Sequence, residues 1–168
     1  MGAKGDAIPR IKKFLSEAKQ GVVPSTFWPH SEAGQNAEAK QETRILFNDA
    51  DEIFTTPKPE RLLRLVLEVA TNESDLVLDS FLGSATTSAV AHKMGRRHIG
   101  IEMGRHAATH CQPRLQKVVE GEQGGISKSV NWNGGNGFKF YRLGKPVFDN
   151  EGRRCHRHVG DGVGGIGA

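Results

Sequence analysis

The chain has 168 residues, of which 36% are hydrophobic and 21 are glycine, and it carries a formal net charge of +4. No apolar run approaches the roughly 18 residues that a membrane-spanning helix needs, and the N-terminal residues do not lead into a signal-peptide core. The two cysteines lie far apart and exclude a disulfide framework. We therefore expect a cytoplasmic protein of about one domain, without membrane contact, whose mild basicity allows but does not establish binding to nucleic acid.

The first fifty residues are predicted to hold two helices separated by extended chain. Apolar residues recur on one face of a helix over residues 8–19. Two prolines favour extended chain over residues 22–30, and a polar turn is expected at residues 31–36. A second helix is predicted from residue 37 to about residue 47, capped by Asn36.

The middle of the chain alternates helical and strand patterns, which predicts an α/β fold with a mostly parallel sheet flanked by helices. The elements expected are helices at residues 59–70, 86–94 and 107–120 and strands at residues 75–79 and 98–102. Pro113 must kink the last helix or start its second half. Beyond it, alternation predicts a strand at residues 138–143.

The stretch around which the chain is organised covers residues 76–87. A short apolar strand ends at Asp79 and is followed by a turn of small residues and the start of a helix. Gly83 allows a ligand to approach the backbone closely. The next strand ends at Glu102, and an acidic residue about 20 positions beyond a glycine turn is the ribose-binding arrangement of nucleotide-type folds.

Residues 79–87 read Asp-Ser-Phe-Leu-Gly-Ser-Ala-Thr-Thr and resemble the D-P-F-x-G-S-G-T-T motif of S-adenosylmethionine-dependent amino-methyltransferases that act on DNA. Residues 54–63 resemble the segment that precedes this motif in the circularly permuted class, which has its catalytic half first. Further stretches resemble the modification subunits of type III restriction–modification systems, which methylate adenine N6; they are residues 21–29, 34–42, 95–103, 113–115 and 137–144.

The resemblance implies a site for S-adenosylmethionine. Its contacts are expected from Asp79, Phe81, Gly83, Ser84, Thr86, Glu102, Thr56 and Lys58. Asp79 is expected to accept a hydrogen bond from the methionine amino group, and Glu102 to accept both ribose hydroxyls. Lys58 and Thr56 are expected near the methionine carboxylate, and the turn residues around its methionine end.

Two departures from the family pattern affect the function that the resemblance implies. The catalytic tetrapeptide of the class is Asp or Asn, then Pro-Pro, then Tyr or Phe; none of the seven prolines here follows Asp or Asn, and no two are adjacent. Within the loop, Ser80 replaces Pro and Ala85 replaces Gly. If Ala85 needs a positive φ, its methyl group costs about 1 kcal/mol. The resemblance therefore implies a fragment of an adenine-N6 DNA methyltransferase that carries the cofactor-binding half and has no catalytic residue of its own.

By the same resemblance, residues 1–50 are the end of a target-recognition region and lead-in, and residues 51–149 are the S-adenosylmethionine-binding subdomain. Residues 150–168 are expected to be a disordered tail. The partners implied are double-stranded DNA, through the intact enzyme, and a restriction subunit or a second methyltransferase chain. The alternatives are a non-catalytic nucleotide- or DNA-binding module and a gene remnant without activity. No metal site is expected, since His106, His110 and Cys111 have no second ligand pair nearby in the sequence.

Overall fold

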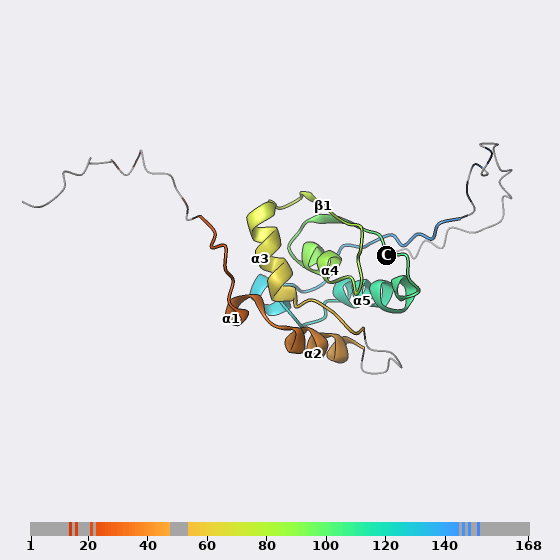
Figure 1. Cartoon of the computed structure of the whole chain (residues 1–168), viewed down its shortest axis with the longest axis horizontal. Coiled ribbons are helices and arrows are strands. Elements are labelled where there is room, and N and C mark those ends of the chain that lie inside the picture. The colour runs from red at the N-terminus through yellow and green to blue at the C-terminus, as the bar shows by residue number, and fades with distance from the viewer. Residues whose placement is uncertain are drawn as a thin grey trace, which may run out of the picture.

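The computed structural model describes residues 14, 16, 21, 23–47, 54–144, 146, 148 and 151. Its elements, in chain order, are α1 (His30–Ala33), α2 (Asn36–Leu46), α3 (Glu60–Ala70), β1 (Leu76–Asp79), α4 (Thr86–Lys93), β2 (Arg97–Gly100), the π-helical turn η2 (Ala107–Cys111), α5 (Gln112–Val119) and the 3-10 turn η3 (Ser127–Val130). In Figure 1, α4 lies in the middle of the body, with α3 on one side and α5 on the other.

The two strands are parallel and are joined through α4, which makes β1, α4 and β2 one β-α-β unit. Leu78 pairs with Ile99 and Val77 with His98. Because successive strand residues point to opposite faces, Val77 and His98 point to the inner face, toward the helices, while Leu78 and Ile99 point to the outer face.

The core lies between α3, α4 and the inner face of the sheet. Leu67 of α3 packs with Val90 and Ala91 of α4 and with Ile126, which precedes η3, and all four are buried. Val77 of β1 lies against this cluster. Helix α4 connects β1 to β2 and lies between the sheet and α3, so the core residues gather around it.

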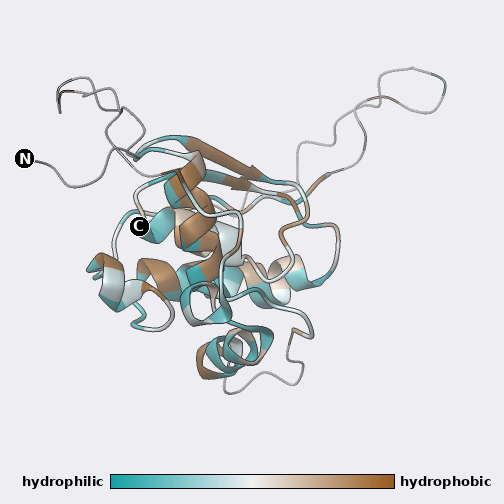
Figure 2. Ribbon diagram, turned by 60° about the vertical axis from the view of Figure 1, so that its left-hand side comes forward, coloured by the Kyte–Doolittle hydropathy of each residue, from teal (hydrophilic) through white to brown (hydrophobic). Residues whose placement is uncertain are grey.

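The outer face of the sheet is open and mostly apolar, with Arg97 as its exposed charged residue. Leu76, Leu78 and Ile99 are 52%, 63% and 49% exposed, and Ile101, just beyond β2, is 53% exposed. Figure 2 shows the two strands at the outside of the body, largely brown along one of them and partly brown along the other, with helices on one side only. Parallel sheets are normally covered on both faces, so this arrangement is half of the usual one.

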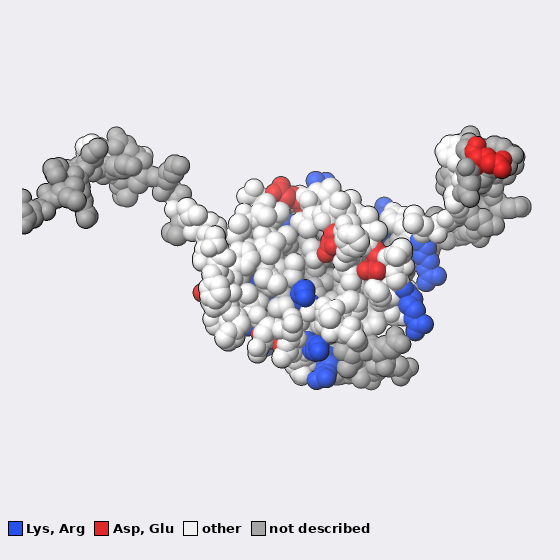
Figure 3. Space-filling model, in the orientation of Figure 1, with Lys and Arg blue, Asp and Glu red and all other residues white. Residues whose placement is uncertain are grey.

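Charged side chains follow no comparable pattern on the face drawn in Figure 3. Lysine and arginine residues are scattered over its described surface and do not form one continuous patch. This face therefore offers no broad basic surface of the kind that tracks a DNA backbone.

Helices α2, α3 and α4 and the pair of parallel strands confirm the expectations for those segments. Pro113 stands in the first turn of α5, directly after η2, so it does start the second half of the helical stretch. Pro113 has no backbone N–H, and the preceding turn winds as a π-helix because the regular bonding pattern is interrupted there.

Four details of the prediction were wrong. The polar turn expected at residues 31–36 contains the short helix α1, and Asn36 is the first residue of α2 rather than its cap, which is Gln35. Strand β2 ends at Gly100, so Glu102 lies beyond the strand. Residues 138–143 form no strand: residues 138–141 line a cavity together with residues 97–100 of β2, and the segment is not paired with that strand. The helix expected at residues 8–19 and the tail at 150–168 lie outside the described residues, apart from isolated positions.

Candidate functional site

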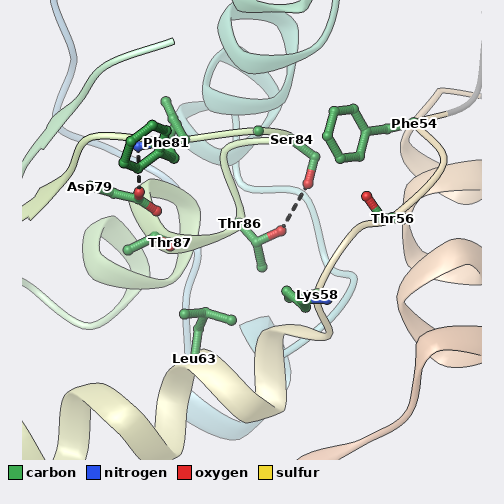
Figure 4. Close-up of a pocket in the computed structure, with 11 residues that line it drawn as sticks. Phe54, Thr56, Lys58, Leu63, Asp79, Phe81, Ser84, Thr86 and Thr87 are labelled. Carbon is green, nitrogen blue, oxygen red and sulfur yellow. Dashed lines mark hydrogen bonds between the residues drawn. The ribbon is translucent and has the colours of Figure 1, made fainter.

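A pocket of about 290 Å³ lies at the carboxyl end of β1, between the β1–α4 loop and the segment that leads into α3 (Figure 4). Its lining consists of Phe54, Thr56, Lys58, Leu63, Asp79, Phe81, Leu82, Gly83, Ser84, Thr86 and Thr87. The structure thus brings together every predicted site residue except Glu102, which lies directly beside the pocket and contacts Gly83. The carboxyl ends of parallel strands are where open α/β sheets bind ligands.

The β1–α4 loop is held by short hydrogen bonds. The Asp79 side chain accepts one from the Phe81 N–H at 3.0 Å, and the Leu82 N–H donates to the Ile101 carbonyl at 3.0 Å. Gly83 has a φ of +59°, and a Cβ there would lie 3.3 Å from the ring of Phe54. Glycine is required at this position both for the backbone conformation and for the close approach of the opposite wall.

Ala85 adopts the left-handed conformation, with φ 62° and ψ 24°, and caps the N-terminus of α4. The strain considered for this position is therefore present, at a cost of about 1 kcal/mol relative to glycine. Ala85 is fully buried, packs with Leu82 and Cys111, and does not line the pocket. The replacement of glycine strains the loop without filling the space for a ligand.

Cys111 contacts the β1–α4 loop through a hydrogen bond. Its Sγ donates to the Gly83 carbonyl at 3.1 Å. Burial, with a further contribution from the charge of Glu102, raises the pKa of the Cys111 thiol to about 12. Cys111 therefore stays protonated at neutral pH and acts as a hydrogen-bond donor, not as a nucleophile.

Glu102 is tied to the glycine turn. Its Oε2 accepts the Gly83 N–H at 2.8 Å, and its Oε1 accepts the Gly104 N–H at 2.8 Å and contacts His106 Nε2 at 3.0 Å. Burial would raise the pKa of Glu102, but the backbone amides of Gly104, Gly83 and Met103 and the charge of His106 outweigh it and hold the pKa below its usual value. Glu102 is therefore ionised at neutral pH, and most of its acceptor positions are occupied.

The two walls of the pocket differ in charge. Asp79 and Phe81 lie on the loop side, and Thr56 and Lys58 come from the opposite segment (Figure 4). Thr56 and Lys58 are exposed at their side of the pocket. A carboxylate on one wall and an ammonium on the other suit a ligand that carries both a positive and a negative group, such as the amino-acid end of a small molecule.

Sequence reasoning missed part of this site. Phe54 and Leu63 line the pocket but were not expected as contacts. The available signal was their place in residues 54–63, the stretch that resembles the segment before the motif. Sequence reasoning also missed that Glu60, Lys93 and Arg114 are buried together behind the loop. No local sequence signal marks this cluster, because Arg114 and Glu60 are 54 positions apart and meet only in the fold.

The described residues contain no group of three or more histidine, cysteine, aspartate or glutamate side chains placed to hold a metal ion. Within the same residues, no helix combines the length and the apolarity needed to cross a membrane.

Comparison with known proteins decides the family. A family model described as DNA methylase (N6_N4_Mtase) matches residues 5–112, which include the loop, Glu102 and both strands. The chain belongs to the N6/N4 DNA methylase family. The match covers more than half of the chain and includes both walls of the pocket.

Individual relatives come from restriction–modification systems. The chain is 56% identical over 86 residues, 51% of its length, to the probable type III restriction-modification enzyme HindVI Mod subunit of Haemophilus influenzae. It is 50% identical over 48 residues (29% of the chain) to the type II methyltransferase M1.MboII of Moraxella bovis, and 43% identical over 65 residues (39% of the chain) to M2.DpnII of Streptococcus pneumoniae.

These alignments cover 12%, 18% and 24% of the respective relatives. The chain therefore corresponds to a limited part of each of them. No solved structure matches the chain.

Proposed function

We propose that this chain supplies the S-adenosylmethionine-binding part of a site-specific DNA adenine-N6 methyltransferase, built on a partial Rossmann-like methyltransferase fold. The observation that carries the proposal is the pocket at the end of β1, which gathers Asp79, Lys58 and the glycine turn beside Glu102 in a member of the N6/N4 DNA methylase family. The 56% identity to a type III modification subunit supports the choice of adenine-N6 chemistry.

The residues present fit the methyl donor. Asp79 would accept a hydrogen bond from the methionine ammonium group. From the opposite wall, Lys58 and Thr56 would donate hydrogen bonds to the methionine carboxylate. Gly83 and Ser84 let the backbone approach the ligand, with Phe81 and Thr86 beside them. When bound, S-adenosylmethionine supplies an electrophilic methyl group.

Glu102 holds the ribose. Two hydroxyls need two acceptor positions, but the Gly83 and Gly104 amides and His106 already occupy most of those on Glu102. The two amide bonds shape the loop, whereas the side chain of His106 lies at the rim and is 35% exposed. His106 would therefore give up its contact with Oε1 for Glu102 to accept the ribose hydroxyls, while the Gly83 and Gly104 amides would remain bonded.

The methyl transfer itself needs residues that this sequence does not contain, because no Asp- or Asn-Pro-Pro motif is present in the 168 residues. In the intact enzyme these residues flip the adenine out of the double-stranded DNA and hold its amine. The open apolar face of the sheet, with Leu76, Leu78, Ile99 and Ile101, is where the catalytic half packs. A second methyltransferase chain, with or without a restriction subunit, is the partner that this arrangement suits.

Calorimetric titration of the 168-residue chain with S-adenosylhomocysteine tests the proposal. We expect saturable binding at one site, and a loss of at least about tenfold in affinity, roughly 1.4 kcal/mol, for Glu102→Ala. The matched control is Glu120→Ala, which removes a glutamate from the exposed end of α5. A folded wild-type chain that does not bind, or a Glu102→Ala variant that binds as the wild type does, contradicts the proposal.

A non-catalytic binding module is the second candidate, and the lack of a catalytic tetrapeptide favours it. The two candidates differ when a separately produced catalytic half of a related methyltransferase is added. Transfer of a labelled methyl group to DNA only in the mixture supports the enzyme part, while ligand binding without transfer in any mixture supports the binding module.

A further inference from the structure

A cluster of four charged side chains lies behind the pocket; we call Glu60, Lys93, Arg114 and Glu122 the charged cluster. The side chains of Lys93, Arg114 and Glu60 are 0%, 1% and 2% exposed. Glu60 Oε2 contacts Lys93 Nζ at 2.7 Å, and Glu60 Oε1 contacts Arg114 Nη2 at 2.9 Å. Lys93 also pairs with Glu122. Two negative and two positive groups balance one another.

Arg114 connects this cluster to the loop. Its Nη1 donates to the Thr86 hydroxyl at 2.9 Å and to the Ser84 carbonyl at 3.2 Å. These two acceptors flank Ala85, the residue in the left-handed conformation. Arg114 Nε is buried and has no hydrogen-bond partner among the described residues. The guanidinium group is thus placed for its contacts with the loop and Glu60 and not for full hydrogen bonding.

Glu60 connects the same arginine to the other wall. It is the first residue of α3 and follows directly on the segment that carries Phe54, Thr56 and Lys58. The carboxylate of Glu60 also accepts the Ile126 N–H at 3.0 Å, which fixes it from a third direction. Arg114 therefore contacts the loop on one side and Glu60 on the other, and so joins the two walls behind the pocket.

Stability alone is a poor reason for such a cluster. Burying charged groups has a large desolvation cost, and replacing a buried ion pair by apolar residues of similar volume is often neutral or stabilising. Burial alone would raise the pKa of Glu60. The charges of Arg114 and Lys93 outweigh burial and hold that pKa below its usual value. What an arginine adds over an apolar residue is direction, because its planar fork reaches three acceptors at fixed angles.

We propose that Arg114 is a positioning residue for the methyl-donor pocket: through Ser84, Thr86 and Glu60 it sets the separation of the β1–α4 loop from the segment of Thr56 and Lys58. Arg114 does not line the pocket. It acts by holding in place the residues that do. This inference rests on the proposed function, since it concerns the same pocket.

Two variants test the role of Arg114. Arg114→Lys keeps the charge but cannot reach Thr86, Ser84 and Glu60 together. The double variant Glu60→Met with Arg114→Met replaces the pair by apolar side chains. Arg64→Lys is the matched control, because Arg64 pairs with Glu68 at 2.7 Å on the exposed side of α3. Each chain is titrated with S-adenosylhomocysteine, and its thermal unfolding and backbone amide hydrogen exchange are measured.

We expect both variants to fold and to bind at least about tenfold more weakly than the wild type, with faster exchange at Ser84, Ala85 and Thr86 but not within α3. Arg64→Lys binds as the wild type does. Wild-type affinity in a folded Arg114 variant overturns the positioning role, and so does failure of both variants to fold, which would assign the cluster to the fold itself. Unchanged hydrogen exchange at the loop in the folded variants also overturns the positioning role. A wild-type chain that does not bind S-adenosylhomocysteine contradicts the proposed function instead.

Discussion

The two faces of the β1–β2 sheet have opposite surroundings. On the inner face, Val77 packs against a closed core and His98 contacts His92 of α4. On the outer face, Leu78 is 63% exposed. The same two strands thus have one face that is packed against the core and one face that is open to solvent. The core therefore forms on the α4 side of the sheet, and the outer face stays uncovered by the described residues.

A second contrast follows from the first. The Lys93 side chain is fully buried, while three aliphatic residues of the sheet, Leu76, Leu78 and Ile99, are exposed. Burial here follows the position in the fold and not the residue type, because Lys93 finds Glu60 and Glu122 as partners on the covered side. An apolar residue on the outer face has no corresponding cover within the described residues.

The largest expected effect separates the two faces directly. Leu67→Ala removes a buried side chain of the inner core and should lower the free energy of unfolding by about 2–4 kcal/mol. Leu78→Ala on the outer face should change it by less than about 0.5 kcal/mol in the chain alone. Urea unfolding of both variants measures the difference. Equal destabilisation by the two substitutions would show that the outer face is covered in solution.

A smaller effect concerns pH and the inner face. Burial, with the neighbouring His92, lowers the pKa of His98 to about 4. A histidine with a lowered pKa contributes stability that is present above its unfolded value of about 6.5 and is lost as the pH falls toward 4. We expect a loss of up to about 2 kcal/mol over that window, allowing for the partial exposure of the ring.

The control for this prediction is His98→Gln, which should abolish the loss. Glu42 acts in the opposite direction, since burial and the charge of Glu60 raise its pKa to about 7, so its stabilising contribution is lost as the pH rises. That contribution is common to both proteins and cancels in their difference. A pH profile of unfolding that is the same for wild type and His98→Gln would place His98 outside the inner face.

The smallest effect lies at the loop between the two faces. Ala85→Gly removes the strain of a left-handed alanine and should raise the free energy of unfolding by about 1 kcal/mol, less the entropy that glycine adds to the unfolded chain. Because Ala85 does not line the pocket, the affinity for S-adenosylhomocysteine should change by less than about threefold. Thermal unfolding and calorimetry of the same preparation check both statements. A large gain in affinity would mean that the alanine restricts the pocket.

The strand, turn and helix at residues 76–94 were predictable because their signals are local: an apolar run, small residues and a glycine stop. The set of pocket residues followed from the resemblance, and the structure places seven of the eight in one lining. The charged cluster was not predictable, because Glu60 and Arg114 are 54 positions apart and their pairing is a tertiary event. The pattern at residues 138–143 misled for a related reason, since alternation makes a strand only where the segment pairs with a neighbour, and this segment lines a cavity beside β2 without pairing with it.

In the proposed function, the glycine turn and Glu102 form the site of the methyl donor. The most direct test is to titrate the isotopically labelled 168-residue chain with S-adenosylhomocysteine and to follow the backbone amides by nuclear magnetic resonance. The account predicts that the largest shifts fall on Phe81, Gly83, Ser84 and Gly104, two of which donate to Glu102. Shifts confined to the outer face of the sheet, or no shifts in a folded sample, would contradict it.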